Sequence, residues 1–535
     1  MKNGVAAAPA LDAGRIAATF GSENEHQLLR SMQPIQLLHA TNAISRQKHR
    51  LQQDLAFVML VENQAYDKLV EVRWAGEDKV WRTLQAEYLA SGGDASREIW
   101  GAHASFLASD DASLPGDIEF ALRYRVRGRD FRDDDESRNY FLNADSGVLL
   151  HPNVQLIDAD YAPALIDGQR CYRITVALRQ TLQPERVFVH WTTDGWRSTR
   201  VTPCFFHRMY WDKQLRSNAR NPNRYGTSVW IGQLKIDDAF RVDYAIGCET
   251  PSRTIWDNNF GRNYVARRRR LKILTLNLHC YQEENQDAKF SQIAKAIDDL
   301  DIDVVCLQEV GEPCGNGSGD WTSNAAKIIR DRLSQYYHLH TDWSHIGFDR
   351  YREGVAVLSR HGIVMTDAGY VSSNNDVHSI NSRKVVMVQV NVPYMGLVNV
   401  FSAHLSWPSG GFFEQFERLR AWANHKHGGN LATTFLCGDF NVKAGSEGYQ
   451  AVVRTREYED QFLAATSQDA FEKIFRKQSP NIERHLPRDG RIDFIFMQKG
   501  GSLRAVAATE LFTNQDHYGR VSDHTGYCVE FEPNS

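Results

Sequence analysis

Hydrophobic and polar residues alternate in short runs through the first half of the chain, from about Asp54 onward. Val70 to Trp74 and Arg186 to Trp191 are such runs, and clusters of turn-forming residues separate them. A period of two is typical of half-buried β-strands, and many short strands with frequent turns favour a β-sandwich. Residues 1–53 combine good helix formers with few strand signals, so we expect a partly helical lead segment there.

An internal repeat lies within this β-rich half. Residues 119–140 align without gaps on residues 243–264, so the two segments differ by a constant 124 positions (243 minus 119). Several paired positions hold the same residue, namely Ala121/Ala245, Asp133/Asp257, Arg138/Arg262, Asn139/Asn263 and Tyr140/Tyr264. A match of this length predicts a duplicated β-module, with one copy at 54–145 and the other at 150–265.

Aromatic and amide residues are concentrated in the second copy of the repeat. The sequence WDNN at residues 256–259, followed by Asn263 and Tyr264 and preceded by Trp191 and Trp196, resembles the family 21 carbohydrate-binding module. That family includes starch-binding domains and the glycogen-targeting subunits of a protein phosphatase. The resemblance covers both copies and implies two immunoglobulin-like β-sandwich modules, with an α-glucan as the ligand of the second copy.

The resemblance also implies a set of sugar contacts, since an indole can stack on the apolar face of a glucose ring and amides can bond its hydroxyls. The expected contacts are Trp196, Trp256, Asn259, Asn263 and Tyr264. Alternatively, the aromatic rings fill a sandwich core and the amides shape a turn. The first copy has Arg132 in place of Trp256 and acids at 134–135 in place of the amides. A purely structural repeat is therefore an equal alternative for the first copy.

After Arg270 the pattern changes to hydrophobic strands that alternate with amphipathic helices. Residues 271–277 and 304–307 are predicted strands. Between them, apolar residues recur at helical spacing at Phe290, Ile293, Ile297 and Leu300. Later runs predict further strands at 354–358, 384–392, 398–403, 434–437 and 492–497. We therefore expect residues 271–535 to form a four-layered α/β sandwich, in which helices flank two packed β-sheets.

Polar residues that suit catalysis or metal binding stand at or near six of the predicted strand ends. They are Asn277, Gln308-Glu309, His404, Asp439 with Asn441, Asp493, and Ser522-Asp523-His524. Each alone is typical of a solvated turn or a helix cap. Together and in this order, they resemble the endonuclease/exonuclease/phosphatase superfamily.

This second resemblance implies a metal-dependent phosphoesterase. Hydrolysis of a phosphoester requires a divalent cation, an activated water and hydrogen-bond donors for the transition state. Carboxylate and amide oxygens are hard ligands that suit Mg²⁺, with Mn²⁺ as a second candidate. The expected metal ligands are Glu309, as the primary ligand, with Asn277 and Asp523 nearby.

The other strand-end residues would act on the substrate and on the water. Asp439 is expected to orient and polarise the attacking water, while Asn441 and His404 donate hydrogen bonds to non-bridging oxygens. His524 can exchange a proton near neutral pH, and Asp493 would fix its tautomer and favour its charged form. No covalent enzyme intermediate is implied.

Three more polar residues near the predicted site have ordinary roles as their default interpretation. His279 follows Asn277 by two positions and is expected to be a turn residue beside the site. Arg360 and Arg383 lie near predicted strand ends and could hold phosphate bidentately, but ordinary surface ion pairs are expected for both.

Composition and charge narrow the class of protein but not the substrate. With 42% hydrophobic and 24% charged residues, the chain lacks the signature of disorder. The formal net charge of -4 gives no global attraction to nucleic acid or to an anionic membrane. No secretory-type apolar core and no membrane-length apolar stretch occur, and the eight cysteines include no CxxC pair. We therefore expect a soluble, cytoplasmic protein with reduced thiols and no membrane span.

Two functions remain open from the sequence. One is a Mg²⁺-dependent phosphodiesterase or phosphatase that its second β-module targets to glycogen or another α-glucan. The other is a DNase-like or RNase-like nuclease whose β-modules bind protein or nucleic acid instead of sugar. Both place the same chemistry in residues 271–535.

Overall fold

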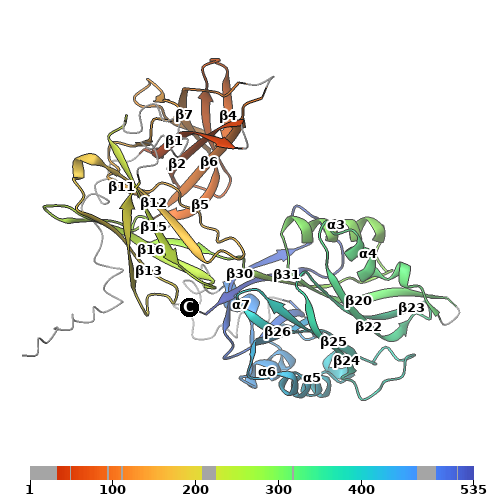
Figure 1. The fold of residues 1–535 in the computed structure, drawn as a ribbon. Helices are drawn as coiled ribbons and strands as arrows, with labels where there is room; N and C mark the ends of the chain where they lie inside the picture. Colours follow the sequence, from red (N-terminus) through yellow and green to blue (C-terminus); the bar gives the residue numbers. More distant parts are fainter. Residues whose placement is uncertain are drawn as a thin grey trace, which may run out of the picture. The chain divides into compact units, whose positions relative to one another are not determined.

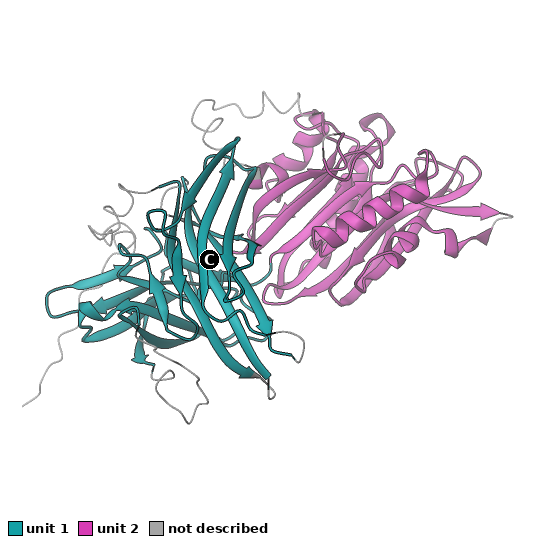
Figure 2. Cartoon of the chain, turned by 90° about the horizontal axis from the view of Figure 1, so that it is seen from above, with its two compact units in different colours: residues 1–269, 535 teal, residues 270–534 magenta. Residues whose placement is uncertain are grey.

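The computed structural model describes residues 33–47, 50–92, 96–109, 113–207, 224–315, 318–466, 490–514 and 516–534. The chain divides into two compact units, Met1–Arg269 with Ser535 and Arg270–Asn534 (Figure 2). The first unit is all-β in its described part apart from one turn of 3-10 helix, and the second combines strands and helices (Figure 1). None of the helices within the described ranges is long and apolar enough to cross a membrane.

The first β-module is built from two sheets that share one hydrophobic core. One sheet has the strand order β10 (Val148–Leu150), β1 (Ile35–Gln47), β2 (Arg50–Glu62), β6 (Arg97–Leu107), β5 (Glu87–Gly92). The other has the order β4 (Trp81–Gln85), β3 (Lys68–Ala75), β7 (Ile118–Val126), β8 (Arg129–Asp133), with β9 (Tyr140–Leu142) also paired to β7. Phe57 of the first sheet contacts Phe120 of the second, with 4.8 Å between ring centroids.

The start of this module corrects the expectation of a partly helical lead segment over residues 1–53. Strand β1 begins at Ile35 and strand β2 at Arg50, and the two pair along their whole length as a hairpin. Cross-strand pairing and a buried face override the local helix propensity of this segment. The module therefore runs from Ile35 to Leu150. The rest of the expected lead segment, residues 1–32, lies outside the described residues.

The strands of the second β-module form one continuous sheet. Its strands follow the order β11 (Leu156–Asp158), β12 (Cys171–Arg179), β15 (Thr227–Lys235), β14 (Arg200–Phe206), β13 (Arg186–Thr192), β16 (Arg241–Glu249), β17 (Thr254–Asp257), with β18 (Tyr264–Arg267) paired to β16. The sheet is continuous because β14 pairs with β13 through residues 200–204 and with β15 through residues 205–206. Its two halves face one core that contains Tyr172, Trp191 and Tyr244.

The internal repeat is reproduced in strand register. Leu122 pairs with Asp133 in the first copy, and Ile246 pairs with Asp257 in the second. The loops that follow adopt the same backbone, with positive φ at four equivalent pairs of positions: Asp135/Asn259, Glu136/Phe260, Ser137/Gly261 and Asn139/Asn263. The duplicated sequence therefore encodes a duplicated strand-loop-strand unit.

The second unit contains two β-sheets. The larger has the order β22 (His338–Gly347), β23 (Tyr351–Ser359), β20 (Val304–Gly315), β19 (Leu271–Asn277), β31 (Gly526–Pro533), β30 (Leu503–Leu511), with β21 (Ser318–Gly319) paired to β20. The smaller has the order β24 (Ile363–Tyr370), β25 (Lys384–Val392), β26 (Gly396–His404), β27 (Leu431–Asp439), β29 (Asp493–Gln498), β28 (Tyr458–Asp460).

Helices pack against each of these sheets through separate cores. Helices α3 (Gln286–Asp299) and α4 (Ala325–Asp331) share a buried cluster with β19 and β20, and α5 (Phe412–Lys426) and α6 (Glu447–Arg454) share one with β25, β26 and β27. The remaining described helices are α7 (Gln461–Thr466) and the 3-10 turns η1 (Gln180–Leu182), η3 (Trp321–Ser323) and η4 (Pro408–Gly410).

Parallel pairing in both sheets explains where polar residues gather. Strand β19 runs parallel to β20, and β26 runs parallel to β27. Parallel strands end at the same edge of a sheet, where ligands commonly bind in α/β folds. In each pair, the polar residues at the strand ends therefore lie side by side.

Candidate active site

Strand ends from both sheets of the second unit meet at one buried cluster. Asn277 is the last residue of β19, and His404 and Asp439 are the last residues of β26 and β27 and pair with each other. Asp493 is the first residue of β29 and lies opposite Asp439. The Asn277 amide Nδ2 donates to Glu309 Oε1 at 2.9 Å and to Asp439 Oδ2 at 3.1 Å, so it joins the two sheets at this point.

A second polar connection between the sheets lies just beneath this cluster. Gln308 Nε2 donates to Ser402 Oγ at 3.1 Å, and Ser402 Oγ donates to the Leu307 carbonyl at 3.1 Å. Gln308 and Ser402 are both fully buried. Satisfied buried hydrogen bonds of this kind fix the relative position of packed elements. Gln308 thus joins the two sheets through hydrogen bonds, while its neighbour Glu309 supplies a carboxylate to the cluster.

The direction of Glu309 depends on a β-bulge. The pairing of β20 with β23 shifts between Leu307 and Val310, and Glu309 adopts a left-handed backbone with φ of 49°. A bulge re-aims one side chain of a strand, and a non-glycine residue in this region is held there by its surroundings. The carboxylate of Glu309 therefore reaches Asn277 across the strand pair.

His524 lies between two buried carboxyl groups. Its Nδ1 is 2.7 Å from Asp493 Oδ2, and its Nε2 is 3.9 Å from Asp439 Oδ2. Burial alone would lower the pKa of His524, but the hydrogen bond to Asp493 and the charges of Asp493, Asp439 and Asp523 raise it to about 9. Burial raises the pKa of Asp493. The predicted pairing of His524 with Asp493 is present in the structure.

Asp439 is the most enclosed acid of the cluster. Burial and the charge of Asp493 raise its pKa, while His524, the Asn441 backbone N–H and Asn277 lower it. The Asn441 N–H donates to Asp439 Oδ1 at 2.8 Å from a left-handed residue with φ of 52°. The Asn441 amide Nδ2 donates to the Leu405 carbonyl at 2.8 Å. Only one amide hydrogen of Asn441 is therefore left for the expected role toward substrate oxygens.

Three groups of side chains could hold a cation, judged by ligand atoms within 4.8 Å of one another across the described residues. They are Glu309 with His404 and Asp439, Asp439 with Asp493 and His524, and His279 with Glu283 and Asp523. The expected ligands Asn277 and Glu309 are in direct contact. The third, Asp523, is half exposed and is grouped instead with His279, whose Nδ1 lies 3.6 Å from Asp523 Oδ1.

Two charged residues of this cluster, Arg383 and Glu353, were not assigned to it from sequence. Arg360 forms the expected surface ion pair, with Asp301. Arg383, however, lies inside the site with Nη1 3.1 Å from His404 Nδ1, which corrects the expectation of an ordinary surface pair. Glu353 lies beside Glu309, and burial together with the charge of Glu309 raises its pKa to about 7. The only sequence signal was the place of Arg383 directly before strand β25.

The five expected sugar contacts of the second β-module do not form one exposed surface. Tyr264 is 3% exposed and stacks on Tyr244 in the core, with ring centroids 5.0 Å apart. Asn259 is also 3% exposed, and its Nδ2 donates to the Asn263 carbonyl at 3.1 Å within the loop. For Tyr264 and Asn259 the core and turn interpretation therefore replaces the sugar contact. Trp196, Trp256 and Asn263 are partly exposed.

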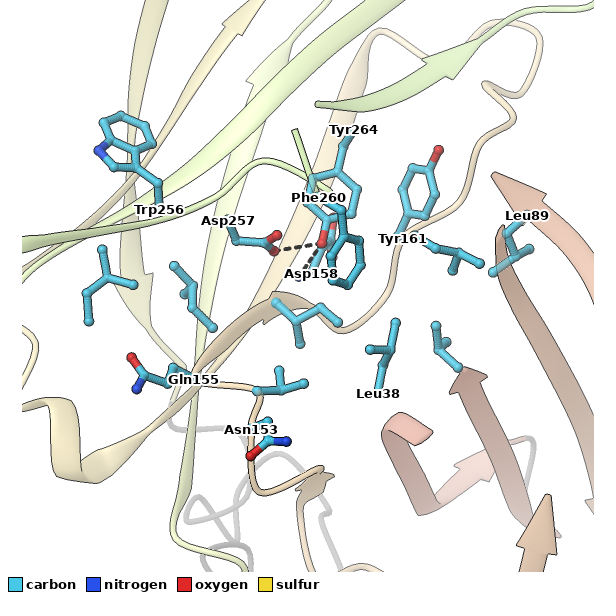
Figure 3. A pocket seen from close by; sticks show the side chains of 16 residues that line it. Leu38, Leu89, Asn153, Gln155, Asp158, Tyr161, Trp256, Asp257, Phe260 and Tyr264 are labelled. Atoms are coloured by element: carbon cyan, nitrogen blue, oxygen red, sulfur yellow. Dashed lines mark hydrogen bonds between the residues drawn. The ribbon is translucent and has the colours of Figure 1, made fainter. Parts of the chain in front are cut away.

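Trp256 and Tyr264 line a pocket between the two β-modules of the first unit (Figure 3). Its volume is about 70 Å³, and Leu38 and Leu89 of the first module contribute to its wall. Asp257, also in the wall, accepts a hydrogen bond of 2.6 Å from the Tyr264 hydroxyl. Trp256 and Tyr264 of the second copy therefore form part of the junction between the two β-modules.

Comparison with known proteins concerns the second unit. Residues 274–524 match the model of the Endonuclease/Exonuclease/phosphatase family. Similar solved structures include an endonuclease/exonuclease/phosphatase family protein from Leptotrichia buccalis C-1013-b (27% identity, TM-score 0.41), a mannosyl-6-phosphatase from Bacteroides thetaiotaomicron VPI-5482 (18%, 0.35) and humanized TDP2 of D. rerio (16%, 0.36). Each match covers 49% of this chain and 99% of the other chain. A search of curated proteins finds no match.

Proposed function

We propose that residues 274–524, which match the model of the Endonuclease/Exonuclease/phosphatase family, form a phosphoester hydrolase that uses a divalent cation and a water nucleophile. The observation that carries this proposal is the position of His524, with one ring nitrogen 2.7 Å from Asp493 and the other 3.9 Å from Asp439. A histidine placed in this way can exchange a proton with a water that Asp439 orients.

The residues around Asn277 fit a hard cation. Glu309 and Asp439 both accept from Asn277 Nδ2, so two carboxylates converge on this amide, while Asn277 Oδ1 accepts from the His279 backbone N–H at 3.0 Å. Oxygen donors of this kind suit Mg²⁺, and Mn²⁺ accepts the same ligands. Glu309 would be the primary ligand, with Asn277 and Asp523 as the further ligands that the family resemblance implies. A bound cation there would neutralise charge on the phosphoryl oxygens and lower the pKa of a bound water.

The protein groups supply orientation and proton transfer. Asp439 accepts a hydrogen bond from the attacking water and fixes its direction toward phosphorus. His524 exchanges the proton, while Asp493 holds its ring and stabilises the charged form. His404 and the free amide hydrogen of Asn441 donate to non-bridging oxygens as negative charge develops on them.

Hydrolysis assays on the full chain test the chemistry. Bis-p-nitrophenyl phosphate, p-nitrophenyl phosphate, plasmid DNA and RNA are each incubated with Mg²⁺ or with EDTA, and His524→Ala is the blank. We expect Mg²⁺-dependent turnover of at least one substrate and a loss of about 10³-fold in the variant. Equal turnover by wild type and His524→Ala, or full activity in EDTA, would contradict the assignment. Cleavage of DNA or RNA alone would favour the nuclease alternative.

We further propose that the second β-module targets the enzyme to an α-glucan. Support comes from the sequence resemblance and from two partly exposed indoles, Trp196 and Trp256. Retention of the full chain in glycogen-containing native gels is the test, with Trp256→Ala expected to reduce it. Arg132→Ala, the equivalent position in the first copy, is the matched control. No retention of wild type, or equal retention of Trp256→Ala, would rule out this targeting.

A further inference from the structure

The guanidinium of Arg383 has an unusual partner for a charged group. Arg383 directly precedes strand β25, and its Nη1 lies 3.1 Å from Nδ1 of His404 at the end of β26. Its Nε donates to Ser406 Oγ at 3.3 Å. Two contacts therefore hold the guanidinium of Arg383, one with the His404 ring and one with the Ser406 hydroxyl.

The chemistry of the two groups decides which nitrogen of His404 carries the proton. A guanidinium is always protonated in proteins and offers only donors. Nδ1 of His404 must therefore accept, because a second N–H at that position would point a donor at a donor. The ring is then neutral, and its proton is on Nε2. Burial and the charge of Arg383 also lower the pKa of His404 well below its ordinary value.

The protonated nitrogen faces the reacting groups. His404 Nε2 is 3.7 Å from Asp439 Oδ2, and His404, Asp439 and Glu309 form one of the clusters of potential ligands. His404 is 8% exposed, so most of its ring is shielded from bulk water. A neutral N–H donor in a buried site costs no reorganisation when negative charge develops beside it.

The geometry points to Arg383 as a positioning residue, which holds His404 as a neutral donor through Nε2–H and prevents it from acting as a proton acceptor. This inference rests on the proposed function for its catalytic meaning. It assigns different tasks to the two histidines of the site by their partners. His524 has a carboxylate on Nδ1, which stabilises the charged ring, and His404 has a guanidinium on Nδ1, which excludes it.

A purely structural role for Arg383 would be to anchor the loop after β26. That loop has other anchors, since Gln415 Oε1 accepts from the Ser406 backbone N–H at 2.8 Å and Gln415 Nε2 donates to Ser406 Oγ at 3.0 Å. Removal of the Arg383 side chain therefore leaves the loop attached through Gln415. The tautomer of His404, by contrast, depends on the donor at Nδ1, which Arg383 supplies, and Asp439 beside Nε2 favours the same tautomer.

Nitrogen NMR of the histidine side chains tests the tautomer without reference to activity. In the full chain labelled with ¹⁵N-histidine, and with His404→Gln used for assignment, we expect His404 to show an unprotonated Nδ1 and a protonated Nε2 from about pH 5.5 to 8.5. In Arg383→Met the Nδ1–H form or the charged ring should appear, while Arg383→Lys, which still donates to Nδ1, should keep the wild-type pattern. A wild-type His404 that is charged at neutral pH, or an unchanged tautomer in Arg383→Met, would overturn the inference.

Kinetics then separate positioning from direct contact with the substrate. Arg383→Met is expected to lower kcat by about 10²-fold with KM changed little, and Arg383→Lys to recover most of kcat. In a His404→Ala background, Arg383→Met should cause little further loss, because both changes remove the same donor. A full additional loss in that background would show that Arg383 acts on the substrate itself. If wild type hydrolyses no phosphoester, the proposed function fails while the NMR result still decides the tautomer.

Discussion

Each unit of the molecule buries a pair of aspartates, and the two pairs have different partners. In the second unit, Asp439 and Asp493 flank His524. In the first unit, which we call the β-unit, Asp158 and Asp257 accept hydrogen bonds of 2.6 Å from the hydroxyls of Tyr244 and Tyr264. Burial raises the pKa of all four carboxyl groups. A raised pKa alone therefore does not distinguish a catalytic acid from a structural one.

The side chain that contacts each pair of aspartates distinguishes the two pairs. Burial raises the pKa of Tyr244 and Tyr264 well above the ordinary value, so these hydroxyls do not exchange protons near neutral pH. A histidine between two carboxylates does titrate in an accessible range. The first copy of the repeat supports the structural interpretation of the tyrosine pairs, because the Tyr140 hydroxyl donates to Asp133 at 2.7 Å although Trp256 is replaced by Arg132 there. The Asp–Tyr hydrogen bond is therefore a structural feature that both copies share.

The largest expected effect comes from removing one carboxylate from each pair. Asp439→Asn should lower phosphoester hydrolysis by about 10³-fold, because the water loses its acceptor while an amide keeps the shape. Asp257→Asn, the matched change in the β-unit, should leave the rate within about twofold. Initial rates at saturating substrate and Mg²⁺ measure both. A similar loss in the two variants would show that the comparison is wrong.

The next effect is a pH dependence of stability in the β-unit. The pKa of Asp158 is raised to about 7 in the folded state by burial, from 3.8. The folded state then holds more protons than the unfolded state between these values, so stability is greatest below about pH 4 and falls until about pH 7. Each pKa unit of difference corresponds to about 1.4 kcal/mol, so the free energy of unfolding falls by at most about 4 kcal/mol.

Hydrogen exchange at strands β12 and β16 measures this fall, and Asp158→Asn should flatten it because an amide does not titrate. Asp54→Asn, on an exposed hydrogen bond to Ser105 in the first module, is the control and should keep the slope. A wild-type β-unit whose stability rises between pH 4 and pH 7 would contradict the assignment of a raised pKa to Asp158.

The site could be predicted from sequence where local pattern and long-range structure agree. Asn277, His404 and Asp439 were predicted as site residues because each stands at a strand end in the order of a known superfamily, and the structure places them at the ends of parallel strands. Arg383 was assigned to the surface because its burial depends on packing against His404 and Ser406, which no local pattern encodes. Long-range contacts decide such positions.

In the β-unit, the lack of information about long-range contacts affected the roles assigned to side chains more than the detection of strands. The repeat was visible because both copies keep the residues that shape the loop. Tyr264 was assigned to a ligand because a sequence does not show whether an aromatic ring faces the core or the solvent. Strand β1 and the first residues of β2, at 50–53, were missed because their pairing, rather than their intrinsic propensity, stabilises them.

A smaller effect should follow from cation binding, and it should be confined to the second unit. Mg²⁺ at about 100 times its dissociation constant should raise the local unfolding free energy at the ends of β19 and β20 by about 2.7 kcal/mol. Asp158 and Asp257 are already bonded to tyrosines, so hydrogen exchange in the β-unit should not change. Glu309→Gln should abolish the protection, and Glu312→Gln on the same strand should keep it. Protection in both units would remove the distinction between the two pairs of acids.

The smallest effect concerns the two copies of the Asp–Tyr bond. Tyr140→Phe and Tyr264→Phe each remove one hydroxyl donor to a partly buried acid and should each cost about 1–2 kcal/mol of local stability. Equal costs are expected because each ring also stacks on an equivalent aromatic residue, Phe120 at 5.1 Å and Tyr244 at 5.0 Å between centroids. Hydrogen exchange at β9 and β18 measures the two losses. If Tyr264→Phe instead reduced glycogen retention with no loss of protection, the bond of the second copy would serve a ligand, and the copies would differ in function at this pair.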